Sequence, residues 1–354
     1  MAQRLLMKGN EAISEAAIRA GCRHYFGYPI TPQNEISAYM SKRMPQVGGL
    51  FLQAESEIAS INMVLGAASA GVRAMTSSSS PGMSLKTEGI SYLAGSDLPA
   101  VIVNIQRGGP GLGSIQPAQN DYHQATKALG HGDMRGLVLA PYTVQEMADF
   151  VFELFDLTEK YRMPGLLLCD GVLGQMMEPV QFPEMEAKSS DKPWAATGHQ
   201  NKRAKNVVNS LALQPDVLEK QNLLRAERYA KIRESETRAE SFMCEDAEIV
   251  VVAYGASARV ARSAVSAARR QGIKAGLLRP ITLWPFPQKE LVAATKGAKA
   301  LLTVEMSMGQ MVDDVRCAIE FKKPVYFFGR TGGVIHTPAE VMGQIENIAE
   351  GVKS

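Results

Sequence analysis

The sequence predicts an α/β protein in two parts, and three observations support this fold class. From the start of the chain to about Pro183, short apolar segments typical of buried strands alternate with amphipathic helical segments. Such alternation is typical of a parallel sheet covered by helices on both faces. The segment 184–246 is polar and charged, and the alternation resumes at residue 247. We therefore expect a first domain over residues 1–183, a linker with a connecting helix over 184–246, and a smaller α/β domain over 247–354.

The first domain is expected to begin with a short strand and a helix. Its clearest strands are Leu50–Gln53, Ala100–Ile105 and Gly165–Cys169, because each is a short apolar run of strand length. One helix is specified in detail: Thr143 is placed to cap its first turn and Glu146 to complete a capping box. The residues that follow form one apolar stripe at helical spacing, which predicts packing on the core: Met147, Phe150, Val151, Leu154 and Phe155.

The region 184–246 contains a turn-rich polar stretch, SSDKPWAATGHQNKRAKN, and then a charged helical run, LEKQNLLRAERYAKIRESETRAES. The run predicts a connecting helix whose charged face lies in solvent or packs against another subunit. The second domain is expected to contain the strands EIVVVAYG, KAGLL, ALLTVE and VYFFG. A helix from about Ser257 to Arg270, closed by Gly272, follows the first of them.

Composition narrows the classes of function. The chain has 354 residues, is 45% hydrophobic and carries a formal net charge of +2, so nothing in the balance favours nucleic acid or an anionic membrane. No apolar run approaches the roughly 20 residues that span a bilayer, and we expect a cytoplasmic location.

The four cysteines form no CxxC pair, which argues against a zinc or iron–sulfur site held by this chain alone: Cys22, Cys169, Cys244 and Cys317. P-loop, GxSxG and HExxH motifs do not occur, so nucleotide hydrolysis, esterase chemistry and zinc proteolysis are disfavoured.

Four segments carry residues suited to chemistry, and each follows an expected strand. Two prolines flank Ile30 and Thr31 in YPITP, where they would fix the Thr31 hydroxyl in one direction. Glu55 and Glu57 precede and open a helix, where the helix dipole stabilises a carboxylate. The run TSSSSPGMS, residues 76–84, is either a plain loop or an anion site at a helix start.

The fourth segment, NIQRGGPGLGSIQPAQND, begins with an arginine. Arg107 directly follows the strand AVIVNI, and the glycines after it let a substrate approach the backbone. A guanidinium can bind a carboxylate through two parallel hydrogen bonds, so Arg107 suits an acidic substrate. The sequence GGPGLG does not meet the spacing of a dinucleotide fingerprint.

Together, YPITP, AESEIAS, TSSSSPG and NIQRGGPG resemble, in order and spacing, the alpha subunit of 2-oxoacid:ferredoxin oxidoreductases. The second domain adds LRPITLWPFP, VEMSMGQM and GRTGG, which look like the transketolase-C-terminal-type domain of the same subunits. The resemblance implies a thiamine diphosphate-binding, pyrimidine-type first domain. It also implies roles for single residues: Thr31 and Arg107 hold the substrate carboxylate, Glu57 hydrogen-bonds N1′ of the aminopyrimidine with Glu55 as the alternative, and Pro29 and Ile30 line the cofactor.

The resemblance further implies that the active site is shared between chains. In this family a GDG motif holds the pyrophosphate and its magnesium ion, but here Cys169 precedes Asp170 and Gly171, so the motif is broken. We expect a permanently bound beta subunit to anchor the pyrophosphate and Mg²⁺. Gamma and ferredoxin-like delta subunits are expected as further partners, with [4Fe-4S] clusters on partner chains, coenzyme A as a substrate and ferredoxin as the acceptor.

The loop after Arg107 bears on substrate choice. It contains no Lys or Arg, so a second carboxylate such as that of 2-oxoglutarate lacks an obvious partner. The branched-chain type acting on 2-oxoisovalerate is favoured, with 2-oxoglutarate, phenylglyoxylate and indolepyruvate as alternatives. Two other functions stay open: a non-catalytic scaffold subunit, and a stand-alone thiamine decarboxylase or transferase, which the broken motif disfavours.

Overall fold

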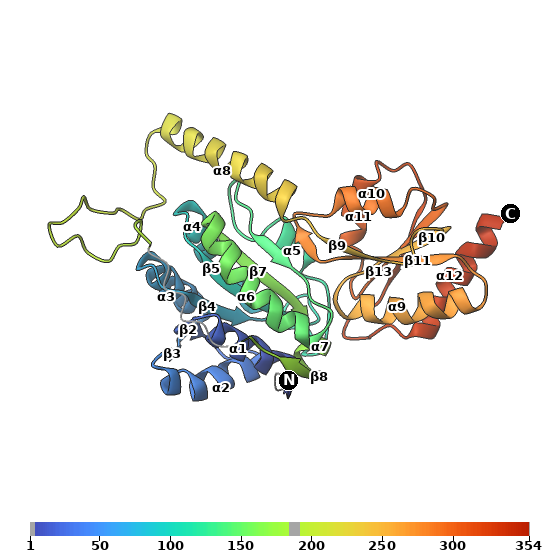
Figure 1. Cartoon of the computed structure of the whole chain (residues 1–354), viewed down its shortest axis with the longest axis horizontal. Coiled ribbons are helices and arrows are strands. Elements are labelled where there is room, and N and C mark those ends of the chain that lie inside the picture. Colours follow the sequence, from blue (N-terminus) through green and yellow to red (C-terminus); the bar gives the residue numbers. More distant parts are fainter. Residues whose placement is uncertain (1–3, 184–191, 354) are drawn as a thin grey trace.

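The computed structural model describes residues 4–183 and 192–353 of the chain. A larger α/β sheet and a smaller one lie side by side, each covered by helices (Figure 1). Among the helices described, none is both long and apolar enough to cross a membrane.

The larger sheet has seven strands in the order β12-β6-β7-β5-β4-β2-β3. Its pairs are parallel except that β12 joins β6 antiparallel. Every residue of β5 and β7 is buried, as expected for central strands of a parallel sheet. The three strands predicted most clearly are confirmed to within one residue at each end. The bounds are β2 (His24–Gly27), β3 (Leu50–Gln53), β4 (Ala74–Ser78), β5 (Ala100–Gln106), β6 (Leu137–Leu139), β7 (Pro164–Asp170) and β12 (Thr282–Trp284).

Helices cover both faces of this sheet. One group packs around α1, which contacts α2, α6 and α7, and in the other group α3 packs on α4. The topology explains the division, because β3-to-β4 and β4-to-β5 connections cross the sheet in the opposite direction from β2-to-β3 and β6-to-β7. The bounds are α1 (Gly9–Arg19), α2 (Asn34–Arg43), the 3₁₀ turn η1 (Pro45–Val47), α3 (Glu57–Ser69), α4 (Ser80–Gly95), α5 (Tyr122–Thr126), α6 (Val144–Tyr161) and α7 (Gly171–Gln175).

The capped helix predicted after Thr143 is α6. Thr143 accepts a hydrogen bond from the Glu146 N–H at 3.0 Å, and the five residues of the apolar stripe are all buried. The Glu146 carboxylate accepts from the N–H of Tyr142 at 3.0 Å, one residue before the cap. The N-terminal strand β1 (Arg4–Lys8) is also present, but it pairs antiparallel with β8 (Met177–Gln181) in a separate two-stranded ribbon.

The predicted connecting helix is α8 (Pro215–Ser235), which lies along the first part of the molecule (Figure 1). Two arginines fix it there: Arg225 donates to the carbonyl of Gly95 at 2.7 Å, and Arg228 pairs with Asp97 at 2.5 Å. Much of its remaining surface is exposed. The first residues of the predicted linker, 184–191, lie outside the described residues.

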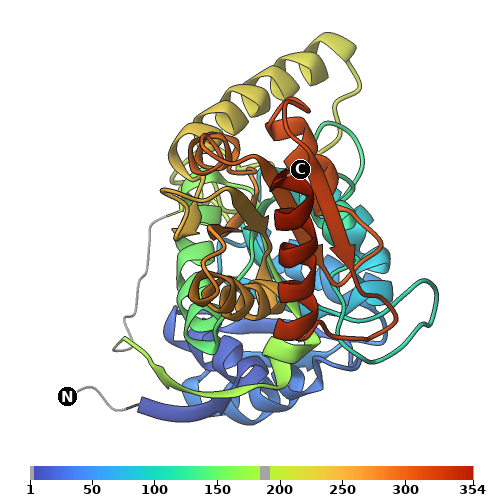
Figure 2. The same ribbon diagram turned by 90° about the vertical axis from the view of Figure 1, so that its right-hand side faces the viewer.

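The smaller sheet has five strands in the order β14-β13-β10-β11-β9, parallel except for β9. Its four predicted strands are confirmed, and the predicted helix begins two residues earlier, at Gly255. Helix α12 packs beside α9 on the outside of this sheet (Figure 2). The bounds are β9 (Ala239–Phe242), β10 (Ile249–Val252), α9 (Gly255–Arg270), β11 (Ala275–Pro280), α10 (Gln288–Ala294), β13 (Ala300–Glu305), α11 (Met311–Ala318), β14 (Val325–Gly329) and α12 (Pro338–Lys353).

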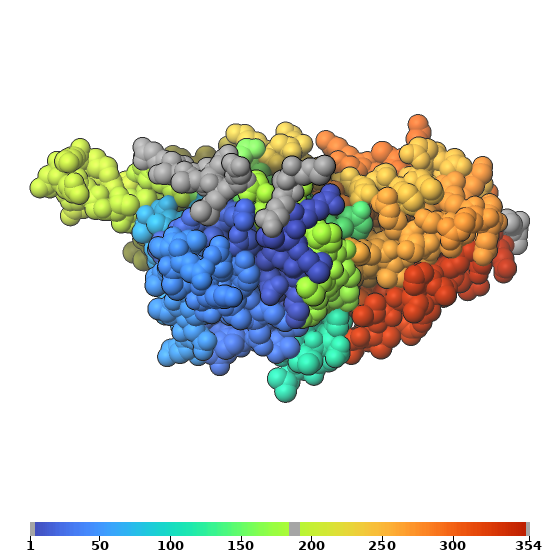
Figure 3. Space-filling view, turned by 60° about the horizontal axis from the view of Figure 1, so that its bottom comes forward, coloured from blue at the N-terminus to red at the C-terminus, as the bar shows by residue number. Residues whose placement is uncertain are grey.

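The two parts are joined by more than the chain connection. Strand β12 belongs to the first sheet although it lies beyond residue 247, and one hydrophobic core runs through both parts. Gln119 binds across the junction: its Oε1 accepts from the N–H of Met306 at 3.0 Å and from Ser257 at 2.7 Å, and its Nε2 donates to the carbonyl of Tyr254 at 2.8 Å. The teal loop after β5 protrudes beside this junction (Figure 3).

Candidate active site

The four segments singled out in the sequence meet at one edge of the larger sheet. Thr31 follows β2, Glu57 follows β3, Ser79 follows β4 and Arg107 follows β5. These strands are parallel neighbours in the order β5-β4-β2-β3, so their carboxyl ends share an edge, where open α/β sheets place their ligands.

Arg107 and Thr31 lie in direct contact. The Arg107 side chain is nearly buried, and its Nη1 donates to the carbonyl oxygen of Thr31 at 2.9 Å and its Nη2 to that of Leu112 at 3.2 Å. The Nε of Arg107 is buried without a hydrogen-bond partner. The Thr31 hydroxyl accepts from Asn34 at 3.2 Å. The structure therefore brings the two predicted substrate residues together, through the backbone of Thr31 and not through its hydroxyl.

The turn that carries Thr31 is anchored by Gln33. The Gln33 N–H donates to the carbonyl of Ile30 at 3.1 Å, and its side-chain amide donates to the carbonyl of Tyr28 at 3.2 Å. Ser77, on β4, donates to the Gln33 side chain at 2.5 Å. Pro29 is exposed and Ile30 is half-buried, so the two residues predicted to line a cofactor lie on the outer side of this turn.

Glu57 occupies the first turn of α3, which Ser56 caps by accepting from the Ala59 N–H at 3.1 Å. Glu57 is 6% exposed, whereas Glu55 is exposed. A Cβ on Gly82 would stand 2.5 Å from Glu57 Oε1, so the carboxylate lies directly against the start of α4. Within residues 4–183 and 192–353, no donor hydrogen-bonds this carboxylate. The burial, the nearby glycine and the open acceptors together mark it as a candidate ligand group.

The serine run after β4 lies between Arg107 and Glu57. Ser80 Oγ accepts from the N–H of Arg107 at 3.0 Å and donates to Asp121 at 2.6 Å. Burial raises the pKa of Asp121, while hydrogen bonds from Ser80 and Asn104 lower it. Ser78 and Ser79 have buried hydroxyls without a partner. This turn therefore places unsatisfied hydroxyls between the Arg107 and Glu57 sides of the sheet edge.

Two residues of this region were missed in the sequence. Asp121 lies in the loop after Arg107, for which the sequence predicted only the lack of a cationic partner. Lys86 lies on α4, fully buried, on the same helix face as Gly82. Lys86 could have been recognised from the sequence, because helical spacing from Gly82 places it on a stripe of otherwise small and apolar residues.

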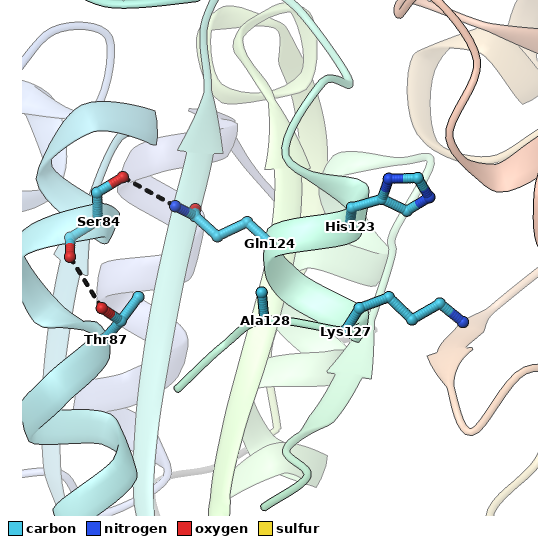
Figure 4. Close-up of a pocket in the computed structure, with 6 residues that line it drawn as sticks. All are labelled: Ser84, Thr87, His123, Gln124, Lys127 and Ala128. Atoms are coloured by element: carbon cyan, nitrogen blue, oxygen red, sulfur yellow. Dashed lines mark hydrogen bonds between the residues drawn. The ribbon is translucent and has the colours of Figure 1, made fainter. Parts of the chain in front are cut away.

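Two neighbouring cavities open next to this edge. One, of about 490 Å³, is lined by Ser80 and Asp121, by the loop after β5, and by Met308 and Thr331 of the second part. The other, of about 550 Å³, shares Ser84 and Gln124 with it (Figure 4). In Figure 4, Gln124 points to Ser84, to which it donates at 3.0 Å, while His123 and Lys127 point away. The first cavity thus lies between both parts of the molecule and beside the Arg107 loop.

Asp170, of the broken GDG motif, has both carboxylate oxygens engaged. One accepts from the N–H of Leu173 at 3.1 Å, and the other accepts from the N–H of Ala256 at 2.9 Å, at the start of α9. Burial raises its pKa, and these backbone hydrogen bonds oppose that shift. In this chain Asp170 therefore ties the second part to the first.

The motifs of the second part also have structural partners. Arg279, in LRPITLWPFP, pairs with Glu146 of α6 at 2.8 Å. Glu305, in VEMSMGQM, accepts from the N–H groups of Met311 and Val312 at the start of α11. In GRTGG, Gly333 packs directly on Gln116 of the loop after β5. The second part thus supports the loop that carries Arg107.

All four cysteines are free; Cys317 is exposed and the others are buried. No group of three or more His, Cys, Asp or Glu side chains able to hold a metal occurs among the residues described.

Comparisons with known proteins agree with the resemblance seen in the sequence. The family model "Pyruvate flavodoxin/ferredoxin oxidoreductase, thiamine diP-bdg" matches residues 15–244, and "Pyruvate:ferredoxin oxidoreductase core domain II" matches residues 247–341. Ketoisovalerate oxidoreductase subunit VorB of Methanothermobacter marburgensis is 51% identical over 97% of both chains. The 2-oxoglutarate synthase subunit KorA of Methanothermobacter thermautotrophicus is 34% identical over 98% of this chain and 99% of its own.

A solved structure supports the same assignment. The 2-oxoglutarate:ferredoxin oxidoreductase of Magnetococcus marinus, with 2-oxoglutarate, coenzyme A and succinyl-CoA bound, superposes with a TM-score of 0.89 at 26% identity. The match covers 98% of this chain and 66% of that longer one. The chain therefore belongs to the 2-oxoacid:ferredoxin oxidoreductases, as a subunit that contains the thiamine diphosphate-binding domain and core domain II of that family.

Proposed function

We propose that this chain is the alpha-type subunit of a complex that oxidatively decarboxylates a 2-oxoacid to an acyl-CoA and CO₂ and passes the electrons to ferredoxin. The observation that carries the proposal is the joint placement of Arg107, Thr31 and Glu57 at one sheet edge. The proposed reaction requires two groups from this chain. One is an arginine that binds the substrate carboxylate, and the other is a buried glutamate whose oxygens can still accept hydrogen bonds.

Glu57 is proposed to hold the pyrimidine side of thiamine diphosphate. The fit is supported by its burial, by the absence of a competing donor among the described residues, and by the space that Gly82 leaves beside it. The unpartnered hydroxyls of Ser78 and Ser79 supply further polar contacts at the same turn. When bound, the cofactor supplies the carbon nucleophile for the 2-oxo group and stabilises the charge left by decarboxylation. Pro29 and Ile30 are proposed to flank it.

Arg107 and Thr31 are proposed to bind the substrate carboxylate. A guanidinium has five N–H donors. In Arg107, Nη1 and Nη2 each donate one hydrogen bond to a backbone carbonyl, and Nε has no partner. Because the contact with the Thr31 carbonyl fixes the plane of the guanidinium, the remaining donors are oriented before substrate arrives. The two residues would bind and orient the acid through its carboxylate until that group leaves as CO₂.

The substrate we propose is 2-oxoisovalerate. The loop Gly108–Asp121 contains no Lys or Arg, and the cavity beside it is bordered by Pro110 and Met308. A distal carboxylate would be buried there without a cation, at a free-energy cost. The 51% identity to a ketoisovalerate oxidoreductase subunit supports the same choice. The 34% identity to a 2-oxoglutarate synthase subunit makes 2-oxoglutarate the alternative substrate.

The partners we propose are a beta subunit that anchors the pyrophosphate and Mg²⁺, and gamma and delta subunits. The engaged carboxylate of Asp170 supports an anchor on another chain, since both of its oxygens accept backbone hydrogen bonds. The [4Fe-4S] clusters are assigned to partner chains. The divisions at residues 183 and 247 and the cytoplasmic location stay predictions.

The test is reduction of a viologen dye by the co-purified complex in the presence of coenzyme A. Four acids would be compared: 2-oxoisovalerate, 2-oxoglutarate, pyruvate and phenylglyoxylate. Preference for 2-oxoisovalerate supports both the reaction and the loop argument, whereas preference for 2-oxoglutarate overturns the loop argument alone. A cluster-loaded complex that reduces no dye with any acid contradicts the proposal and favours a scaffold subunit.

A further inference from the structure

Lys86 is a buried lysine that none of the roles above uses. Its side chain has no exposed surface, and its Nζ donates to Ser60 on α3 and to Thr76 on β4, the second at 2.9 Å. An ammonium is seldom buried without a compensating charge, because its desolvation is costly. Both hydrogen-bond partners are neutral hydroxyls and supply no compensating charge.

The geometry points to Glu57. Gly82 and Lys86 are four residues apart on α4 and therefore face the same side. At Gly82 this side touches the Glu57 carboxylate, and one turn later Lys86 binds Ser60, which lies one turn beyond Glu57 on α3. Ser60 also donates to the Glu57 carbonyl at 2.9 Å. The ammonium and the carboxylate thus lie on successive turns of one α3–α4 contact.

Lys86 changes its charge near neutral pH. Burial lowers its pKa from 10.5 to about 7, and the negative charge of Glu57 opposes that shift. Of the elements packed around its ammonium, α3 contributes Ser60 and the Glu57 carboxylate, and β4 contributes the neutral Thr76. Among the described residues, Glu57 is thus the charged group coupled to Lys86.

We propose that Lys86 is a positioning residue for Glu57: the Lys86 ammonium holds α4 against α3 and places a positive charge beside the Glu57 carboxylate. The inference rests on the proposed role of Glu57 toward the aminopyrimidine. An ionised carboxylate can only accept a hydrogen bond, and N1′ of the ring then carries the proton. The charge of Lys86 would thereby act on the hydrogen bond that selects the form of the pyrimidine.

The first experiment needs no cofactor and no turnover. The full chain, labelled with ¹³C on its lysines, is titrated by NMR, and the Lys86→Met variant identifies the signal of Lys86. In Glu57→Gln the partner charge is lost, so the titration midpoint of Lys86 should fall by about one pH unit. An unchanged midpoint in Glu57→Gln would show that the two groups are not coupled and would overturn the proposal.

The second experiment uses the complex with the Lys86→Met variant. The acidic limb of kcat against pH should move upward by about one unit, while KM for the 2-oxoacid stays the same. Ser60→Ala is the matched control, because it removes a hydrogen bond but keeps the ammonium, so the limb should stay in place even if kcat falls. A limb that does not move in Lys86→Met overturns the role of the charge.

The two experiments separate this inference from the proposed function. If Glu57→Gln shifts the Lys86 titration but leaves turnover intact, the coupling exists and the proposed role of Glu57 is wrong. If Glu57→Gln stops turnover without moving the titration, the proposed function survives and the role of Lys86 does not.

Discussion

Glu57 and Glu305 are buried glutamates at similar places in the two halves of the molecule. Glu57 follows β3 and opens α3, while Glu305 ends β13 just before α11. Glu305 accepts hydrogen bonds from Ser307, Gln310, Met311 and Val312, at 2.9 to 3.2 Å. Glu57 has no such donor in the part of the chain described. Burial and strand-end position are shared, so the unmet acceptors are what distinguish the candidate catalytic carboxylate from the structural one.

The largest expected effect is loss of turnover in Glu57→Gln. The amide keeps the size of the side chain but cannot carry the charge, so kcat of the complex should fall about 100-fold or more. Well above pH 7, where Lys86 is neutral, the melting temperature should change little, because no hydrogen bond within the described chain depends on the carboxylate. A variant that keeps near-normal turnover would support the scaffold function instead.

Glu305→Ala should show the opposite pattern. Removing this carboxylate leaves several buried donors unpaired, so the free energy of unfolding should fall by about 3 kcal/mol. Denaturant unfolding of the purified chain measures this, with Glu57→Ala as the matched variant expected to lose less. If Glu57→Ala proves the more destabilising, the distinction drawn from the hydrogen bonds is wrong.

The next largest effect is expected for Arg107→Ala, which should impair use of the 2-oxoacid. Loss of charged hydrogen bonds worth about 2 kcal/mol should lower kcat/KM for the 2-oxoacid roughly 30-fold, with both KM and kcat affected. Thr31→Val tests the hydroxyl separately, because the backbone carbonyl that binds Arg107 is kept. Unchanged steady-state kinetics in Arg107→Ala would remove the carboxylate assignment.

Gly82→Ala should disturb the same site by crowding. The new methyl group would stand 2.5 Å from Glu57 Oε1, and we expect about a tenfold loss of kcat, equivalent to about 1.4 kcal/mol. Gly66→Ala on α3 is the control, since a Cβ there meets nothing within 4 Å. That variant should keep its turnover and gain up to about 1 kcal/mol of stability from helix propensity.

A separate effect concerns the pH dependence of stability. The pKa of Lys86 is about 7 in the folded chain against 10.5 in the unfolded one, so the unfolded state binds more protons between these values. Stability therefore rises with pH through this window, and the cost of burying the ammonium is fully present below pH 7. Lys86→Met should flatten this rise in melting temperature between pH 7 and pH 10. An unaltered slope would show that Lys86 is not the group that titrates.

Patterns local in the sequence predicted the fold well. The strand runs and the Thr143 cap depend on neighbours a few residues apart, and these elements lie where they were expected. The first strand was found, but not its pairing with β8, because that contact joins residues about 170 positions apart. The hydrogen bonds of Gln119 to the second part of the molecule were not predicted for the same reason.

The site was predicted in its parts but not in its contacts. Thr31, Glu57 and Arg107 were singled out by type and position, and their shared edge followed from parallel pairing. That Arg107 would bind the backbone carbonyl of Thr31, and that Asp121 would be buried against Ser80, depends on side-chain geometry that no spacing encodes.

Strand β12 has a consequence for how the chain can be divided. It pairs with β6 at the end of the larger sheet, so a fragment that stops before residue 247 would leave the β6 edge uncovered. A bare edge offers unpaired N–H and C=O groups to other chains and promotes aggregation. Fragments corresponding to the first domain should therefore precipitate or form strand-swapped oligomers, and a soluble fragment would have to retain Thr282–Trp284 or carry a substitute strand.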